Sequence, residues 1–580
     1  MGISGRQAWL AAAAVLGAAM LWAGCSATYY KEAADREVYQ ILASKQEKAL
    51  GKAAGFTVEP TPESPLGEIK RPREAMPEAT QAPNGLPRQE GAVLLPLRDA
   101  LELAARYGRE YQSRKEELYL AALTLTAERF RWQPQWSGNL SAGATRGPDD
   151  TYVRSGWDFG VSRLLALGGR LSFGLATDLL RYTTGDPRPS ATSTATAEFL
   201  QPLWRGSGRL VAEESLTQAE RDAVYAVRSF ARFQRTFCVD ITSRYYRVLQ
   251  QRDAVINEWD NYQRIVQSRE RAEATAQAGR LPEFQVDQAR QDELRARDTW
   301  NRAVRQYQDQ LDQFKVTLSL PTDAPMEIDP KEIDRLRAAG LKPVDLSPEQ
   351  VIELIELALG CRFDLLPACY LRIDAAFYIE LALELRFDLL SVMDRVGDAE
   401  RKVAIARKGL GPDAELKLTA SIPSEPPTHA MKLEPHRGTY TGGLDVGLPL
   451  QRNAERNAYR QALIGLEQAR RNAEELRDEI KLSVRGAARS LQETAESHRI
   501  QQASVKLAQR RVESTNLLLE RGTATARDVL EANAALVSAQ NALTRALIDH
   551  TLARLNLWRD TELLRVGDDG VWQEVTNVEN

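Results

Sequence analysis

Two long stretches of the sequence lack the residues that break helices. Residues 209–278 contain no proline or glycine, and residues 456–521 contain no proline and only two glycines, Gly465 and Gly486. At 1.5 Å per residue, a helix over the first stretch would reach about 100 Å, well beyond the average globular helix. Between Leu466 and Ala495 the apolar positions recur about every 3.6 residues, and many are alanine. We therefore predict two very long, nearly straight helices that pack closely along alanine-rich seams.

The segments around these helices form two similar halves. The long helices begin after the similar phrases QPLWRGSGR (201–209) and LPLQRNAER (448–456). Each ends at a glycine, Gly279 or Gly522, and a second helical segment follows. This order predicts a twofold repeat in which each half contains a shorter helix, strands, a very long helix, a turn and another shorter helix. The shorter helices of the first half are expected at 97–131 and 283–319.

Alternating apolar and polar residues, which are typical of strands, precede each long helix. Strands of this weakly apolar kind suit a barrel wall with lipid on one side and water on the other. The candidate strands lie at 136–145, 157–165, 170–180 and 192–200 in the first half, and at 414–422 and 439–448 in the second.

The N-terminus has the features of a targeting segment. Arg6 precedes a 16-residue apolar run, residues 8–23, which is short for a spanning helix that needs roughly 20 residues. The run ends in LWAGC, which resembles a lipoprotein signal, although Trp22 stands where leucine is usual. The resemblance implies cleavage after residue 24, lipidation of Cys25 and, with Ser26 next, sorting to the outer membrane. The alternatives are an ordinary secretory signal and an uncleaved anchor.

Composition and motifs argue against several other classes of protein. The net charge is −4 with 27% charged residues, so no nucleic-acid-binding surface is expected. The four histidines and four cysteines are not clustered at ligand spacing, so we expect no metal site. The sequence contains no GxSxG, HExxH or P-loop motif, so we expect neither an enzyme nor a cofactor. Cys238 is expected to be buried in the first long helix, and Cys361 and Cys369 either pair or remain thiols.

The two helix-entry phrases and the segment RGTATARDVLEANAALVSAQNAL (521–543) resemble the outer-membrane efflux protein family, to which TolC belongs. The resemblance covers about residues 95–562. It implies a mainly α fold with β, in which a homotrimer forms a shared α-barrel and β-barrel from two half-repeats per chain. It also implies an outer-membrane exit duct for efflux or type I secretion, joined to a periplasmic adaptor and an inner-membrane pump of the RND or ABC type.

The resemblance to the family implies functional residues at two sites in the chain, the aperture and the adaptor-facing turns. Asp528 and Glu531 fall where the family keeps aperture carboxylates, so three protomers would form a ring that favours cations; the alternative is two solvated surface charges. Phe284 and Gln285 stand where the first half could carry such residues, so the ring depends on the second half alone. The turns expected to face the adaptor comprise Gly279, Arg280, Leu281 and Pro282, and Arg521, Gly522, Thr523 and Ala524.

Family members use two barrel strands per half, whereas the first half here has four candidates. Either one hairpin lies outside the wall, or the barrel is larger than usual. Two other classes of envelope protein fit the sequence less well. A periplasmic adaptor has a single helical hairpin between β domains, which two half-repeats argue against. A structural coiled-coil lipoprotein would lack the strands that precede each long helix.

A repeated phrase complicates the second half. The pattern IELALxxRFDLL occurs at 355–366 and again at 379–390, and LELAARYGREYQ (101–112) is a looser upstream version. Pro367 discourages one helix through both copies. We interpret the copy at 379 as the counterpart of the upstream one and the copy at 355 as a local duplication. Ile379 onward is then expected in the α-barrel wall, and residues 348–366 outside it.

The sequence therefore predicts seven consecutive regions. They are a signal peptide (1–24), a lipid-anchored N-terminal helix (25–55), a proline-rich linker (56–95), the first half (96–321), a linker with the duplicated motif (322–378), the second half (379–562) and a tail (563–580).

Overall fold

The structure is a computed structural model of the chain. It describes residues 26–51, 55, 57–59, 85–86, 92–146, 151–184, 190–279, 282–339, 375–425, 429–448, 450–521, 523–567 and 570–572. Cys25, Cys361, Cys369 and the motif copy at 355–366 lie outside these residues. None of the helices among the described residues is both long enough and apolar enough to cross a membrane.

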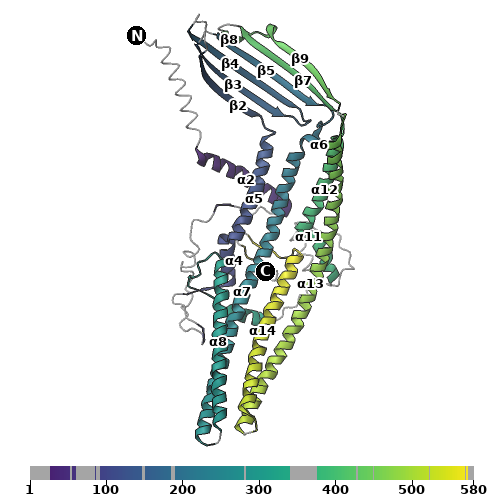
Figure 1. The fold of residues 1–580 in the computed structure, drawn as a ribbon. Coiled ribbons are helices and arrows are strands. Elements are labelled where there is room, and N and C mark those ends of the chain that lie inside the picture. Colours follow the sequence, from purple (N-terminus) through teal and green to yellow (C-terminus); the bar gives the residue numbers. More distant parts are fainter. Residues whose placement is uncertain are drawn as a thin grey trace, which may run out of the picture. The chain divides into compact units, whose positions relative to one another are not determined.

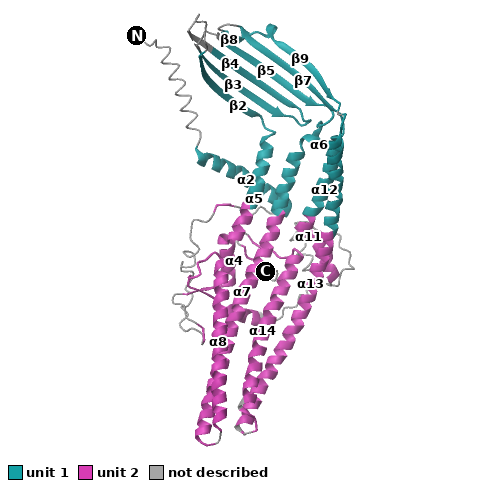
Figure 2. Cartoon of the chain, viewed as in Figure 1, with its two compact units in different colours: residues 1–56, 117–227, 391–474 teal, residues 57–116, 228–390, 475–580 magenta. Residues whose placement is uncertain are grey.

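The chain divides into two compact units, coloured separately in Figure 2. Unit 1 contains residues 1–56, 117–227 and 391–474, and unit 2 contains residues 57–116, 228–390 and 475–580. Each unit draws on both half-repeats, so the units do not coincide with the predicted halves. The predicted region boundaries remain predictions.

Unit 1 contains one large antiparallel sheet (Figure 1). Its strand order is β2-β3-β4-β5-β7, β9 pairs with β7 on the side away from β5, and the short β8 pairs with the end of β7. All six predicted strands are confirmed, and all six belong to this one sheet. Their bounds are β2 (Gln135–Arg146), β3 (Thr151–Leu164), β4 (Arg170–Thr184), β5 (Ser190–Pro202), β7 (Asp413–Glu425), β8 (His429–Leu433) and β9 (Thr439–Gly447).

Helices adjoin this sheet in unit 1. The predicted N-terminal helix is α2 (Ala27–Leu50), and its Ile41 packs against Leu125 of α5 and Ala219 and Ala223 of α7. The small alanines let these helices approach closely. The unit's helices, some of which continue into unit 2, are α5 (Arg109–Phe130), α6 (Arg209–Ala212), α7 (Glu214–Gln277), α12 (Phe387–Lys408) and α13 (Asn453–Glu520), with the single turn η1 (Pro435–Arg437).

Unit 2 is built from helical hairpins. α7 is followed by α8 (Glu283–Thr317), and α13 is followed by α14 (Ala526–Asp560). Between the halves lie β6 (Met326–Ile328) and α9 (Lys331–Ala339), and β6 pairs in parallel with β1 (Val93–Leu95), which precedes the first half. α4 (Leu97–Tyr107) and α11 (Ala375–Leu385) complete the unit. The two long helices predicted from the absence of helix breakers are confirmed as α7 and α13, and Cys238 is buried in α7 as expected.

The expected single helix at 97–131 is wrong. Gly108 leaves the helical region with a ψ of 122°, and the chain divides into α4 and α5. The second half divides in the same way at Arg386, between α11 and α12. In both halves an 11-residue helix is followed by a 22-residue helix. This identical break confirms that the motif copy at 379, and the upstream phrase at 101, occupy equivalent places.

The repeat extends to the two left-handed non-glycine residues found in the described part of the chain. α8 and α14 each have 35 residues, and Ser319 and Glu562, two residues beyond their ends, both have φ of 61°. A non-glycine residue seldom adopts this conformation, and it occurs here at the same position of each half. The two halves therefore share the path by which the chain leaves the second helix of each hairpin.

The second motif copy lies in a buried core of unit 2. Its Ile379, Ala382 and Leu389 pack with Ile480 and Val484 of α13, and with α14. The apolar stripe predicted along α13 is confirmed by the burial of Leu466, Ala473, Ile480, Val484 and Leu491.

Candidate functional site

The large sheet has two faces of opposite character. Residues paired across antiparallel strands share a face, and neighbours along a strand point to opposite faces. One row of paired residues crosses all six long strands and is entirely apolar or aromatic: Trp136, Val161, Phe173, Ala197, Ala420 and Tyr440. The adjacent row, on the opposite face, is entirely polar: Gln135, Ser162, Ser172, Glu198, Thr419 and Thr441.

The apolar face is exposed over large side chains. Leu140 is 81% exposed, Trp136 67%, and Tyr440 62%. The opposite face carries ion pairs between Arg154 and Asp178 (2.8 Å) and between Lys417 and Glu198 (3.1 Å). A large exposed apolar surface marks contact with lipid or protein, and an ionic opposite face marks contact with water.

The strands are long enough to cross a bilayer. The six long strands run from 9 residues in β9 to 15 in β4, and a tilted transmembrane strand needs about 9–11. Among the described strands, β2 pairs only with β3, and β9 pairs only with β7. A sheet in hydrocarbon cannot leave backbone groups unpaired, so these two edges require further strands from outside the chain.

The turns of the two hairpins lie in unit 2. Gly279 has φ of +70°, a conformation that glycine adopts without strain, and its amide donates to the carbonyl of Ala276. Pro282 caps the start of α8. In the other turn, the amides of Thr523 and Ala524 both donate to the carbonyl of Leu518, and the Arg521 amide donates to Leu517. Arg280, Leu281 and Gly522 lie outside the described residues.

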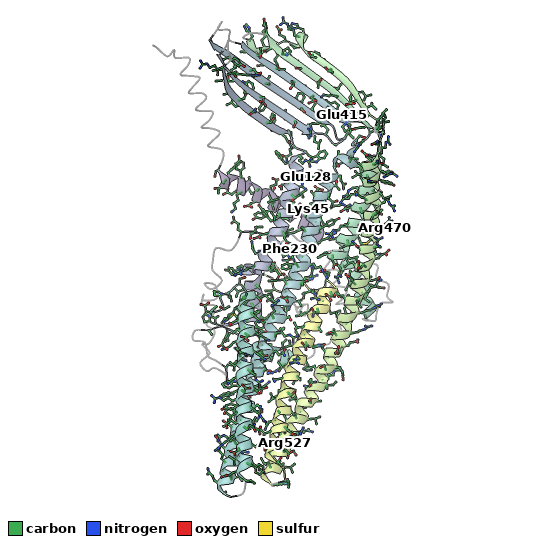
Figure 3. The ribbon with its side chains drawn as sticks, in the orientation of Figure 1. Lys45, Glu128, Phe230, Glu415, Arg470 and Arg527 are labelled. Atoms are coloured by element: carbon green, nitrogen blue, oxygen red, sulfur yellow. The ribbon has the colours of Figure 1, made fainter. Side chains whose placement is uncertain are left out.

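A groove brings residues beside the two turns together. It has a volume of about 190 Å³ and receives Phe284 and Gln285 from the start of α8 and Thr525 and Arg527 from the start of α14. Figure 3 labels Arg527 at this end of α14. Phe284 is 65% exposed, so the first half presents an apolar ring here and the second half presents charges. The two hairpins thus form one end of unit 2.

Asp528 and Glu531 are both exposed in the first turns of α14. The Asp528 carboxylate accepts hydrogen bonds from the backbone amide (2.8 Å) and the hydroxyl (2.7 Å) of Thr525, and the Thr525 hydroxyl accepts from the Asp528 amide. This capping box, in which both hydrogen bonds to the carboxylate favour its charged form, lowers the pKa of Asp528. Glu531 forms an ion pair with Arg527 at 3.2 Å.

These contacts give Asp528 a structural role that the sequence analysis had not assigned to it. The TARD order, Thr followed three residues later by Asp, was the signal that could have revealed the cap. The aperture role of Asp528 and Glu531 remains a prediction. Arg527 offsets part of any negative potential that these residues create.

An ion-pair cluster joins α7 and α8 one to three helical turns from their connection. Arg269 pairs with Glu273 (2.6 Å) and with Glu293 of α8, and Arg290 of α8 also pairs with Glu273 (3.0 Å). Hydrogen bonds from Arg290 and Arg269 lower the pKa of Glu273. Sequence periodicity could not reveal this cluster, because its members lie on two helices whose register depends on the turn.

Comparison with known proteins relates part of the chain to one family. Residues 378–559, in the second half of the chain, match the outer membrane efflux protein family. A search of curated proteins found no match.

Solved structures extend the likeness, at the level of the fold, to most of the chain. OprN, an outer-membrane channel, is 12% identical to this chain with a TM-score of 0.56. The match covers 87% of this chain and 99% of the OprN chain. CusC is 13% identical with a TM-score of 0.55, and the match covers 84% of this chain and 98% of the CusC chain. The open state of the MtrE channel of Neisseria gonorrhoeae is 12% identical with a TM-score of 0.52. The match covers 84% of this chain and 97% of the MtrE chain. The TolC-like fold predicted from the sequence is confirmed.

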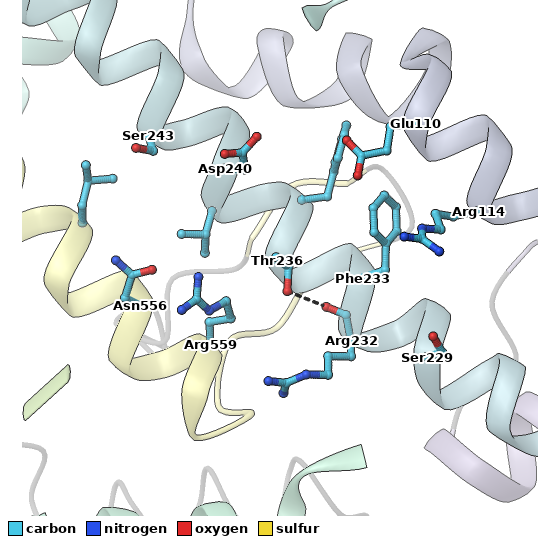
Figure 4. A pocket seen from close by; sticks show the side chains of 13 residues that line it. Glu110, Arg114, Ser229, Arg232, Phe233, Thr236, Asp240, Ser243, Asn556 and Arg559 are labelled. Atoms are coloured by element: carbon cyan, nitrogen blue, oxygen red, sulfur yellow. Dashed lines mark hydrogen bonds between the residues drawn. The ribbon is translucent and has the colours of Figure 1, made fainter. Parts of the chain in front are cut away.

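Among the described residues, neither a metal site nor an enclosed reaction site stands out. No cluster of three His, Cys, Asp or Glu side chains in the described part of the chain could hold a metal ion. A hollow of about 550 Å³ in unit 2 opens between α5, α7 and α14 (Figure 4). Its lining mixes Glu110, Arg114, Asp240 and Arg559, and Thr236 bonds back to the carbonyl of Arg232 in its own helix. The family is one of transport channels.

Proposed function

We propose that this chain is the outer-membrane exit duct of a tripartite efflux or type I secretion system. The observation that carries the proposal is the two-faced sheet, which ends in two unpaired edges. Its apolar face suits lipid, its ionic face suits a water-filled lumen, and its edges need strands from further copies of the chain. A homotrimer, as implied by the family resemblance, would supply those strands.

The helices support a conduit that continues beyond the membrane. α13 buries Leu466, Ala473, Ile480, Val484 and Leu491 of its apolar stripe, and many charged and polar residues cover its other faces. A wall of such helices packs along apolar seams and exposes polar faces to water, as a water-filled α-barrel requires. Substrates would enter from an inner-membrane pump of the RND or ABC type and leave through the sheet.

The paired hairpin turns support a docking role in this proposal. They carry the residues Gly279 to Pro282 and Arg521 to Ala524 that the family pattern assigns to contact with a periplasmic adaptor. Asp528 and Glu531 would line the constriction beside them. Lipidation at Cys25 would add a second attachment to the outer membrane, because three acyl chains on one residue form a stable anchor.

Reconstitution into a planar lipid bilayer tests this function. The full chain should give discrete, long-lived channel currents after purification from outer membranes. A periplasmic adaptor or a structural coiled-coil lipoprotein would give none. A lack of channels from protein that is folded, judged by its helical circular dichroism, would contradict the proposal.

A further inference from the structure

The sheet contributes more strands than two per half would supply. β2 and β3 are paired over twelve residues each, from Gln135–Ser162 to Arg146–Thr151, and β3 continues into β4 without leaving the sheet. We propose that β2 of one protomer pairs with β9 of the next, so that three copies close all six long strands into an eighteen-stranded barrel. This inference rests on the proposed function and adds the partner surface and the width of the duct.

Strand directions permit this seam. Every neighbouring pair in the order β2, β3, β4, β5, β7, β9 is antiparallel. Because the order contains an even number of strands, β2 and β9 run in opposite directions. A second copy placed beside the first therefore meets it with an antiparallel edge, and copies can repeat around a closed ring.

Side-chain chemistry also continues across the seam. Through the unbroken register, Trp136 and Leu140 of β2 share a face with Tyr440 and Leu444 of β9. All four lie on the two edge strands, and each is more than 60% exposed. Joining β2 to β9 therefore extends both the apolar and the polar face without a mismatch, and covers the most exposed apolar side chains of the sheet.

The β2–β3 hairpin is an integral part of the wall. It supplies Trp136 and Val161 to the apolar row that crosses the whole sheet. The turn after β3 is held to the turn after β5 by two hydrogen bonds to the carbonyl of Leu167, from the Gly208 amide (3.1 Å) and the Gln201 side chain (3.2 Å). The phrases LGGRL (167–171) and GSGRL (206–210) follow the two strands, as if one hairpin repeated the other.

The added hairpins widen the duct. With strands about 4.8 Å apart and tilted by about 40°, eighteen strands give a backbone diameter of about 36 Å, and twelve give about 24 Å. Barrels of 16–18 strands are wide enough to leave an aqueous channel between their inward-facing side chains. The barrel of this chain is therefore expected to admit solutes that a twelve-stranded barrel would exclude.

Cysteine cross-linking tests which strand meets β9. Asn139 of β2 and Ala176 of β4 lie in one row on the polar face, each paired to Asp158 of β3. In a chain with Cys238, Cys361 and Cys369 replaced by alanine, Asn139→Cys is combined in turn with a cysteine at one position of β9. These positions, all on the polar face, are Thr439, Thr441, Gly443 and Asp445.

Oxidation in outer membranes should link Asn139→Cys to at least one β9 position, giving covalent dimers and trimers on a heated, non-reducing gel. The matched Ala176→Cys series should stay monomeric, as should Asn139→Cys with Gly442→Cys, which points to the other face. Cross-links from Ala176→Cys would show that β4 is the edge and the hairpin lies outside the wall, overturning the inference alone. A trimer with no links from either series would also overturn it. A chain that forms no trimer in outer membranes would contradict the proposed function as well.

Discussion

Asp528 shows how one residue can have both a structural and an electrostatic role. Its carboxylate caps α14 through Thr525, and it is exposed beside the turn that the family pattern places at the aperture. Replacing it with alanine alone would remove both the cap and the charge. Asparagine separates them, because its side-chain oxygen can still accept from the backbone amide while carrying no charge.

We expect Asp528→Asn to weaken the block of single channels by divalent cations, because three charges leave the predicted ring. We expect Thr525→Ala to cost about 1 kcal/mol in the first turn of α14 and to leave cation block unchanged. Planar-bilayer recordings measure the first effect, and amide hydrogen exchange measures the second. If Asp528→Asn channels are blocked as strongly as the parent, Asp528 acts only as a cap.

Asp398 is a second residue on which several contacts converge. It is buried in α12, accepts from the Tyr225 hydroxyl at 2.7 Å and pairs with Arg221 (2.9 Å) and Arg401 (3.0 Å). Burial alone would raise its pKa, but the hydrogen bonds from Tyr225 and Arg401 and the two positive charges outweigh burial, and the net pKa is lowered. We expect Asp398→Ala to destabilise the fold by about 3 kcal/mol, at the lower end for a broken buried pair because Arg221 is partly exposed.

The pH dependence of this contact follows from the sign of the shift. A carboxylate whose pKa is lower in the folded state stabilises the fold above its unfolded pKa of about 3.9, and that stabilisation is lost as pH falls through the folded value. The destabilisation of Asp398→Ala, measured by denaturant unfolding, should therefore be constant from pH 7 to about 5. It should shrink only below pH 4. A difference that shrinks between pH 7 and 5 would contradict this assignment.

At the scale of elements, strands and long helices were predictable because their signals are local. Alternation located all six strands, and the absence of proline and glycine located α7 and α13. The break of the first short helix at Gly108 was missed, since a single glycine is tolerated in many helices. Its counterpart at Arg386 has neither glycine nor proline, so the sequence offers no signal for it. The Arg269 cluster and the Asp398 contacts depend on which helix faces meet, which one sequence does not reveal.

Neighbouring residues of β2 test the two faces of the sheet. Leu140→Lys places a charge on the apolar face, where a lysine near the middle of a bilayer costs about 2–4 kcal/mol. Asn139→Lys places the same charge on the polar face, at little cost. We expect Leu140→Lys to lower the amount of protein in the outer membrane several-fold and Asn139→Lys to leave it near the parent level. Equal losses for the two variants would mean that the faces are not lipid and water.

The duplicated motif is tested by removing one copy. Deleting residues 355–378 joins Leu354 directly to Ile379 and keeps one complete IELALxxRFDLL segment with the α11–α12 break. Because the second copy supplies the packed residues of unit 2, we expect the shortened chain to reach the outer membrane and to trimerise. Loss of trimers on an unheated gel would show that the first copy is part of the wall.

At the scale of the whole molecule, the two half-repeats and the unpaired sheet edges point to the same assembly. A single chain forms an open sheet and two helical hairpins, and neither encloses a channel alone. Closure by identical copies satisfies the edges and surrounds a lumen in one step. The sequence resemblance implied this assembly, and the added β2–β3 hairpin was visible in the sequence as two extra strands. Only the register showed that it belongs to the main sheet.

Electrophoresis of outer-membrane fractions without and with heating tests the central claim most directly. We predict that the full chain sediments with the outer membrane, migrates as a trimer when unheated, and collapses to a monomer when boiled. A monomer in the unheated lane, or a chain found only in the inner-membrane or periplasmic fraction, would contradict an exit duct built from three copies.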